Sequence, residues 1–149
     1  MTSSKKQRVL FICTHNSARS QMAEGLLRNR FGDFYDVSSA GTHPTSLKPY
    51  AVHVLKEIGI DISWQQSKNL NDFLDEKFDI IITVCESARE SCPFFPGEQI
   101  LHQGFQDPSV VQGTEEKKLA AFRKSRDKID DWIKTYFTLQ WEKRQDSLD

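Results

Sequence analysis

An apolar run that ends in a cysteine and leads through a short polar loop into a helical pattern constrains this chain more than any other feature. Residues 9–12 read Val-Leu-Phe-Ile, Cys13 follows, and residues 14–20 read Thr-His-Asn-Ser-Ala-Arg-Ser. From Ser20 onward, apolar residues recur at helical spacing. Such a strand–loop–helix unit brings backbone N–H groups and the positive end of a helix dipole to one point, which suits a tetrahedral oxyanion.

Cys13 and Arg19 are the candidates for chemistry in this loop. The loop amides and the Arg19 charge are expected to lower the pKa of Cys13 and make it a thiolate nucleophile. The guanidinium offers two donors to oxyanion oxygens. Asn16 tolerates a left-handed conformation, and Ser17 and Ser20 can donate to a thiolate. A cysteine and an arginine separated by five residues are a weak signal alone, so the interpretation depends on the strand and helix around them. The residues expected to bind the oxyanion are Thr14, His15, Asn16, Ser17, Ala18, Arg19 and Ser20.

The order of strand and helix patterns predicts an α/β fold, in which a mostly parallel four-stranded sheet is flanked by helices in three layers. We expect one domain over residues 1–149, with 1–7 and 138–149 as tails. Ligand sites in such sheets lie at the carboxyl ends of the strands. The expected strands are 8–13, 35–40, 78–84 and 99–105, and the expected helices are 18–31, a segment from Pro49 to Gly59 with Ala51, Val54, Leu55 and Ile58 inward, 71–77 and 115–137.

Charge and composition exclude several classes of function. The chain has 20 Lys and Arg against 21 Asp and Glu. It therefore lacks the excess of basic residues that is typical of proteins that bind nucleic acid. No apolar stretch suits a signal peptide or a membrane span, so we expect a cytoplasmic protein without a membrane partner. Three cysteines in a reducing compartment are either packing residues or chemistry, since structural disulfides are rare there.

Cys85 directly follows the strand pattern at 78–84 and should lie at the same sheet edge as Cys13. Cys92 stands before Pro93, and the segment between Cys85 and Cys92 favours helix. A helix would hold the two Cα atoms about 10 Å apart, whereas a disulfide needs less than about 7 Å. A bond between them would therefore need a conformational change, as in a redox switch. The alternative is that Cys85 packs under the sheet edge and Cys92 is incidental.

Asp107 and Pro108 follow the last strand pattern, at the same sheet edge. A carboxylic acid near the nucleophile can protonate a leaving oxygen and then accept a thiol proton. An Asp-Pro turn is the alternative. We expect His15 to point to solvent. His43, His53 and His102 lack metal-ligand spacing and are interpreted as surface or packing residues, so neither a metal nor a cofactor is expected.

The loop from Cys13 to Ser20 closely resembles that of the low-molecular-weight protein tyrosine phosphatase fold, which serves both phosphatases and thioredoxin-coupled arsenate reductases. Cys13, Cys85 and Cys92-Pro93 look like the three cysteines of the reductases. In this fold an aspartate before proline is the general acid, which implies that role for Asp107. The resemblance covers roughly residues 8–137, and its further motifs are Gln21-Met-Ala-Glu-Gly25, Ser39-Ala-Gly41, Gly59-Ile-Asp-Ile-Ser63, Gly104-Phe-Gln-Asp-Pro108 and a stretch from Gly113 to Ile129.

Two positions depart from the reductase pattern. Ala18 stands where the family often has a cysteine, so a fourth thiol is not required. Some members bind potassium near the loop through an asparagine, a glutamate, a serine and an aspartate. Asn16, Glu24 and Ser39 match the first three, but Lys68 stands at the aspartate position. Its ammonium can take the place of the ion, so we expect no potassium dependence.

The resemblance implies an enzyme that reduces arsenate to arsenite through Cys13, Cys85 and Cys92, with thioredoxin as the reductant. Arg19 and Asp107 complete the catalytic set. A tyrosine phosphatase is the alternative, although Ser109-Val-Val111 replaces the tyrosines that phosphatases use to hold an aryl group. A non-catalytic oxyanion-binding or redox-sensing module is a third hypothesis, and the presence of Cys13, Arg19 and Asp107 opposes it.

Overall fold

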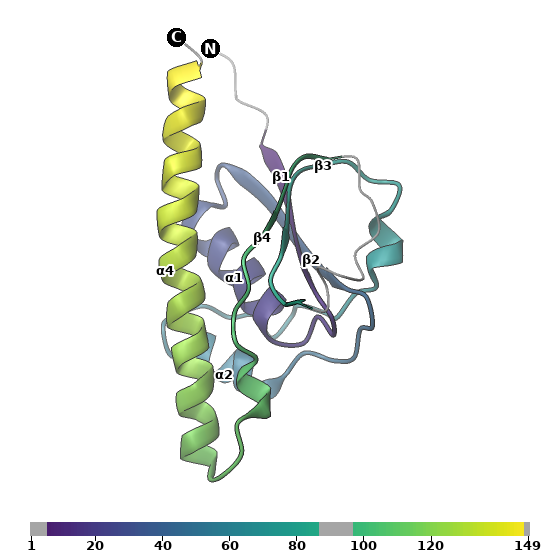
Figure 1. Cartoon of the computed structure of the whole chain (residues 1–149). Helices are drawn as coiled ribbons and strands as arrows, with labels where there is room; N and C mark the ends of the chain where they lie inside the picture. The colour runs from purple at the N-terminus through teal and green to yellow at the C-terminus, as the bar shows by residue number, and fades with distance from the viewer. Residues whose placement is uncertain (1–5, 87–96, 148–149) are drawn as a thin grey trace.

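The computed structural model describes residues 6–86 and 97–147, and it contains a four-stranded parallel sheet (Figure 1). The strands are β1 (Gln7–Cys13), β2 (Tyr35–Gly41), β3 (Phe78–Thr83) and β4 (Gly97–His102), in the order β2-β1-β3-β4. All three strand pairings are parallel. The predicted α/β fold with a four-stranded sheet is confirmed.

The central strand β1 is buried on both faces. Residues Val9 to Ile12 have no exposed surface, and successive side chains of a strand point to opposite faces. The continuous apolar run of the sequence reflects this double burial, as expected for a parallel sheet.

Three α-helices contact one another on one side of the sheet: α1 (Arg19–Phe31), α2 (Pro49–Lys56) and α4 (Glu115–Ser147). The short 3₁₀ helix η1 (Leu70–Phe73), teal in Figure 1, lies on the side of the sheet away from α4. A second 3₁₀ helix, η2 (Pro108–Val110), precedes α4. Among the described residues, no helix combines the length and the apolar character that crossing a bilayer requires.

At both ends, secondary structure extends into the ranges expected to be tails, 1–7 and 138–149, of which residues 1–5 and 148–149 lie outside the described part of the chain. Gln7 already pairs with Tyr35 in the sheet, and α4 continues to Ser147 instead of ending at Phe137. The extra turns of the helix are held by Trp141, whose ring lies 4.1 Å from that of Phe34. This contact between distant parts of the chain leaves no trace in local periodicity.

Smaller differences concern the short elements. The helix predicted at 71–77 is the 3₁₀ turn η1, the last strand is Gly97–His102 instead of 99–105, and Ile58 is 39% exposed instead of inward. Gly59, with φ +84°, does follow the end of α2 as expected. The predicted helix between Cys85 and Cys92, and Cys92 itself, lie outside the described residues.

The carboxyl ends of β1, β3 and β4 meet at one edge of the sheet. Backbone hydrogen bonds between neighbouring segments continue past the ends of the strands. The Val84 N–H donates to the Ile12 carbonyl at 2.9 Å, and the Phe105 N–H donates to the Val84 carbonyl at 3.1 Å. This extended pairing brings Cys13, Cys85 and the segment that leads to Asp107 together.

Candidate active site

The loop after Cys13 is fastened on its outer side by residues 42–48. The N–H groups of this strap hold the loop carbonyls outward. Because C=O and N–H point in opposite directions across a trans peptide, the loop amides face inward. The N–H groups of residues 15–18 donate to no acceptor within residues 6–86 and 97–147, which leaves several donors for an anion. The bonds of the strap run from Thr42, His43, Thr45 and Lys48 N–H to Cys13, Thr14, His15 and Ser17 carbonyls, at 3.3, 2.7, 3.1 and 2.9 Å.

Asn16 fixes the turn of the loop. Its φ of 49° is the one positive value of a non-glycine residue within the described part of the chain, as the sequence predicted. Its amide nitrogen donates to the hydroxyls of Ser20 at 2.7 Å and Ser39 at 2.9 Å. Gly41 permits this close packing, because a Cβ there would lie 2.7 Å from the Thr14 carbonyl oxygen.

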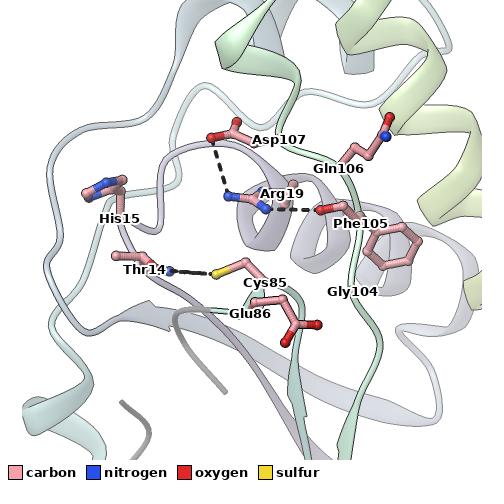
Figure 2. A pocket seen from close by; sticks show the side chains of 9 residues that line it. All are labelled: Thr14, His15, Arg19, Cys85, Glu86, Gly104, Phe105, Gln106 and Asp107. Atoms are coloured by element: carbon pink, nitrogen blue, oxygen red, sulfur yellow. Dashed lines mark hydrogen bonds and ion pairs between the residues drawn. The ribbon is translucent and has the colours of Figure 1, made fainter. Parts of the chain in front are cut away.

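Arg19 opens helix α1 and lies at the mouth of the loop, with its guanidinium held by two partners (Figure 2). It donates to the Phe105 carbonyl at 3.0 Å and lies 3.5 Å from the Asp107 carboxylate. The start of α1 has no side-chain cap and no acidic residue in its first turn. Among the described carboxylates, only that of Asp107 lies within salt-bridge distance of Arg19, and it partly offsets the positive charge at the loop.

Two adjoining cavities share His15, Arg19 and Asp107. The cavity over Cys85, drawn in Figure 2, has a volume of about 550 Å³. The cavity over Cys13 has a volume of about 310 Å³ and also touches Lys48. Cys13 and Cys85 therefore each border a cavity that a small anion can enter.

The sulfurs of Cys13 and Cys85 lie 3.4 Å apart, as donor and acceptor of a hydrogen bond, and neither is in a disulfide. The Thr14 N–H donates to the Cys85 sulfur at 3.3 Å, and the Thr14 hydroxyl lies 3.3 Å from the same atom. The prediction that Cys85 shares a sheet edge with Cys13 is confirmed. Both cysteines are buried.

The predicted lowering of the Cys13 pKa is wrong for this arrangement. The hydrogen bond to Cys85 and burial both raise the pKa of the Cys13 thiol, and they outweigh the Arg19 charge and the Thr14 backbone, which lower it. Ser17 and Ser20 make no hydrogen bond to Cys13 in the described structure. Two thiols in contact cannot both ionise easily, which reasoning on the loop alone could not anticipate.

Asp107 is both a turn residue and a site residue. It caps η2, and its carboxylate accepts from the Ser109 N–H at 3.0 Å and the Ser109 hydroxyl at 2.6 Å. Burial raises the pKa of Asp107, but the hydrogen bonds from Ser109 and the charges of Arg19 and His15 outweigh burial and hold it below its usual value. A carboxyl that acts as an acid here must first receive a proton.

A buried polar network under the loop contains Lys68 where the family resemblance suggested a cation. The Lys68 ammonium lies 3.6 Å from Glu24, and the Ser39 hydroxyl donates to the same carboxylate at 2.6 Å. Arg28 pairs with the other oxygen of Glu24 at 2.5 Å. The Glu24 carboxylate, which would attract a cation, is thus already paired with the positive side chains of Lys68 and Arg28. No cluster of three or more potential metal ligands occurs among the described histidines, cysteines and carboxylates.

Sequence reasoning missed several residues around the site. Gln21 bonds the carbonyls of Asn16 and Gln66, both at 2.9 Å. His102 lies 2.8 Å from Glu86 and 2.9 Å from the Thr83 hydroxyl, beside Cys85. The family motif that begins at Gln21 and its helical spacing from the loop were the signals that could have indicated its role. His15 is exposed, as expected, and contacts the His43 carbonyl.

Comparison with known proteins gives this site a family context. Residues 8–146 match the family described as low molecular weight phosphotyrosine protein phosphatase. The protein belongs to this family. A relative from Halalkalibacterium halodurans, named arsenate reductase, is 46% identical over 132 residues, which are 88% of this chain and 95% of the relative. The resemblance to the arsenate reductases within this fold is therefore confirmed.

Solved structures of both kinds of enzyme resemble the chain. A thioredoxin-dependent arsenate reductase from Corynebacterium glutamicum superimposes with a TM-score of 0.73 at 29% identity, covering 98% of this chain and 65% of that one. A low molecular weight protein tyrosine phosphatase from T. tengcongensis also gives a TM-score of 0.73, at 27% identity, covering 89% and 99%. The fold alone therefore does not separate the two activities.

Proposed function

We propose that this protein reduces arsenate to arsenite through a thiol–disulfide relay of Cys13, Cys85 and Cys92, and that thioredoxin regenerates it. The observation that carries the proposal is the contact of 3.4 Å between the Cys13 and Cys85 sulfurs at the edge of an oxyanion loop. A phosphatase needs only the first thiol. The name of the 46% identical relative supports the substrate.

The first step is attack of the Cys13 thiolate on arsenic. Arsenate binds to the inward N–H groups of residues 15–18 and to Arg19, which turns from Asp107 to the anion. The thiol proton leaves with an arsenate oxygen or through Asp107, and the departing oxygen is released as water. Because the pKa of Asp107 is lowered, its carboxylate starts without a proton. Asp107 therefore accepts the thiol proton first and then donates it to the departing oxygen.

The second step is attack of Cys85 on the Cys13 sulfur. The electron pair of the Cys13–arsenic bond passes to arsenic, which leaves as arsenite, and a Cys13–Cys85 disulfide forms. Thr14 supports this step, because its N–H and hydroxyl lie at the Cys85 sulfur and stabilise negative charge there.

The third step transfers the disulfide away from the loop. Cys92 attacks the Cys85 sulfur, Cys13 departs as a thiolate, and the Cys85–Cys92 disulfide is reduced by thioredoxin. The thioredoxin-dependent solved relative supports this choice of reductant. A cytoplasmic location, where thiols are kept reduced, is part of the proposal.

The test is arsenate-dependent oxidation of NADPH by the protein in the presence of thioredoxin and thioredoxin reductase. We expect sustained turnover by the wild type, and no sustained turnover by Cys92→Ser. Turnover by Cys92→Ser at the wild-type rate would reject the third step, and no turnover by the wild type would reject the proposed activity.

A further inference from the structure

The two sulfurs at the sheet edge are held by rigid backbone. Cys13 ends β1, and Cys85 follows β3, which pairs with β1 in parallel register. One residue before each cysteine, the Val84 N–H donates to the Ile12 carbonyl at 2.9 Å. The 3.4 Å separation of the sulfurs is therefore set by the sheet. A ligand that binds both sulfurs loses little free energy to ordering of the two cysteines.

Paired thiols are ligands for soft, thiophilic centres. Trivalent arsenic is such a centre, and arsenous acid exchanges two of its hydroxyls for two thiols without any change of oxidation state. Two S–As bonds form, two As–O bonds break, and each thiol proton leaves with a hydroxyl as water. An organic arsenoxide forms the same two bonds and releases one water.

The surroundings leave room for this ligand. The cavities of about 310 Å³ over Cys13 and about 550 Å³ over Cys85 adjoin at Arg19 and Asp107. The Thr14 hydroxyl, 3.3 Å from the Cys85 sulfur, is positioned to hydrogen-bond the hydroxyl that remains on arsenic.

We infer that the reduced Cys13–Cys85 pair is a bidentate binding site for trivalent arsenicals. The consequence for catalysis rests on the proposed function. The product of the reaction then competes with its own substrate for the reduced enzyme. It does not stay bound at the moment of its release, because the two sulfurs are then bonded to each other. The site re-forms only when the relay has restored both thiols.

The experiment uses phenylarsine oxide with the reduced full-length protein, and measures the adduct by native mass spectrometry and tryptic mapping. We expect one arsenical per chain, with Cys13 and Cys85 protected from iodoacetamide. Dithiothreitol should remove the arsenical, whereas an equal thiol concentration of 2-mercaptoethanol should not. Arsenite itself should inhibit competitively against arsenate.

Three variants separate this pair from the other possible pairs. Cys92→Ser should keep the adduct, whereas Cys13→Ser and Cys85→Ser should each lose affinity by about 10²–10⁴, the usual advantage of a second linked contact. Retention of the adduct in Cys13→Ser with loss in Cys92→Ser would assign the site to Cys85 and Cys92 and overturn the inference. Equal affinity in all three variants would also overturn it.

Two controls keep the outcomes distinct. Thermal unfolding of the serine variants, with and without phosphate, shows whether the loop still folds and binds an anion. Binding of phenylarsine oxide needs no turnover. A protein that binds the arsenical at this pair but reduces no arsenate would refute the proposed function and leave this inference standing.

Discussion

The guanidinium of Arg19 lies 3.5 Å from the carboxylate of Asp107, so the anion-binding group and the proposed acid are already partners. An oxyanion in the loop competes with Asp107 for the same donors. When the anion takes Arg19, the carboxylate loses a positive neighbour, and its pKa rises toward the range in which it can carry a proton. Substrate binding and readiness for proton transfer are coupled through this one pair.

Replacing Arg19 with lysine should impair arsenate turnover by about 10²–10³, the usual cost of losing one oxyanion donor. An ammonium cannot reproduce the planar fork that reaches both the anion and the Phe105 carbonyl. Steady-state kinetics measure the effect. Arg123→Lys, at a half-buried arginine of α4 that pairs with Glu57 at the end of α2, is the matched control and should remain active. Full activity of Arg19→Lys would remove the arginine from the mechanism.

Asp107→Asn should lower turnover by about 10²–10⁴, the usual scale of general acid–base catalysis. Oxyanion affinity should persist or increase, since Arg19 is released from its carboxylate partner. Single-turnover rates and phosphate-induced stabilisation separate the two effects. Asp131→Asn, on the exposed face of α4, is the control. An unchanged single-turnover rate in Asp107→Asn would reject the role.

Removing Cys85 should make Cys13 ionise at lower pH. The hydrogen bond to Cys85 is the largest cause that raises the pKa of Cys13, while the Arg19 charge, which lowers it, remains in the variant. In a Cys92→Ser background, which removes one competing thiol, the rate of Cys13 alkylation by iodoacetamide should therefore begin to rise at a lower pH with Cys85→Ala than with Cys85 intact. Identical pH profiles would show that the thiol contact does not exist in solution.

Potassium should not change the affinity for arsenate. Glu24 is already paired with Lys68 at 3.6 Å and with Arg28 at 2.5 Å, so a cation near Asn16 would meet two like charges. The KM for arsenate should be the same in sodium chloride and potassium chloride of equal ionic strength. A clear drop in KM with potassium would mean that Lys68 gives way to the ion.

Local patterns predicted the elements of the site, because each has a short-range cause. The apolar run before Cys13, the left-handed Asn16 and the helix at Arg19 are properties of neighbouring residues. The parallel order of strands then placed Cys85 at the same edge. These features need no knowledge of side-chain packing.

Contacts between distant segments could not be predicted in this way. The strap of residues 42–48 and the contact of the Trp141 ring with the Phe34 ring join parts of the chain that no periodicity connects. The pKa of Cys13 depends on the direction of one thiol hydrogen bond to Cys85, which the sequence does not encode locally. Lys68 at the cation position was anticipated only through the family resemblance.

The relay is tested most directly by a single turnover of arsenate without thioredoxin, with the arsenite released per enzyme as the readout. The account predicts one arsenite from the wild type and one from Cys92→Ser, because Cys13 and Cys85 suffice for the first disulfide. Cys85→Ser should release none, while it still hydrolyses an aryl phosphate and is still stabilised by phosphate. Release of one arsenite by Cys85→Ser would contradict the central claim that the Cys85 sulfur, 3.4 Å from Cys13, is the group that reduces arsenic.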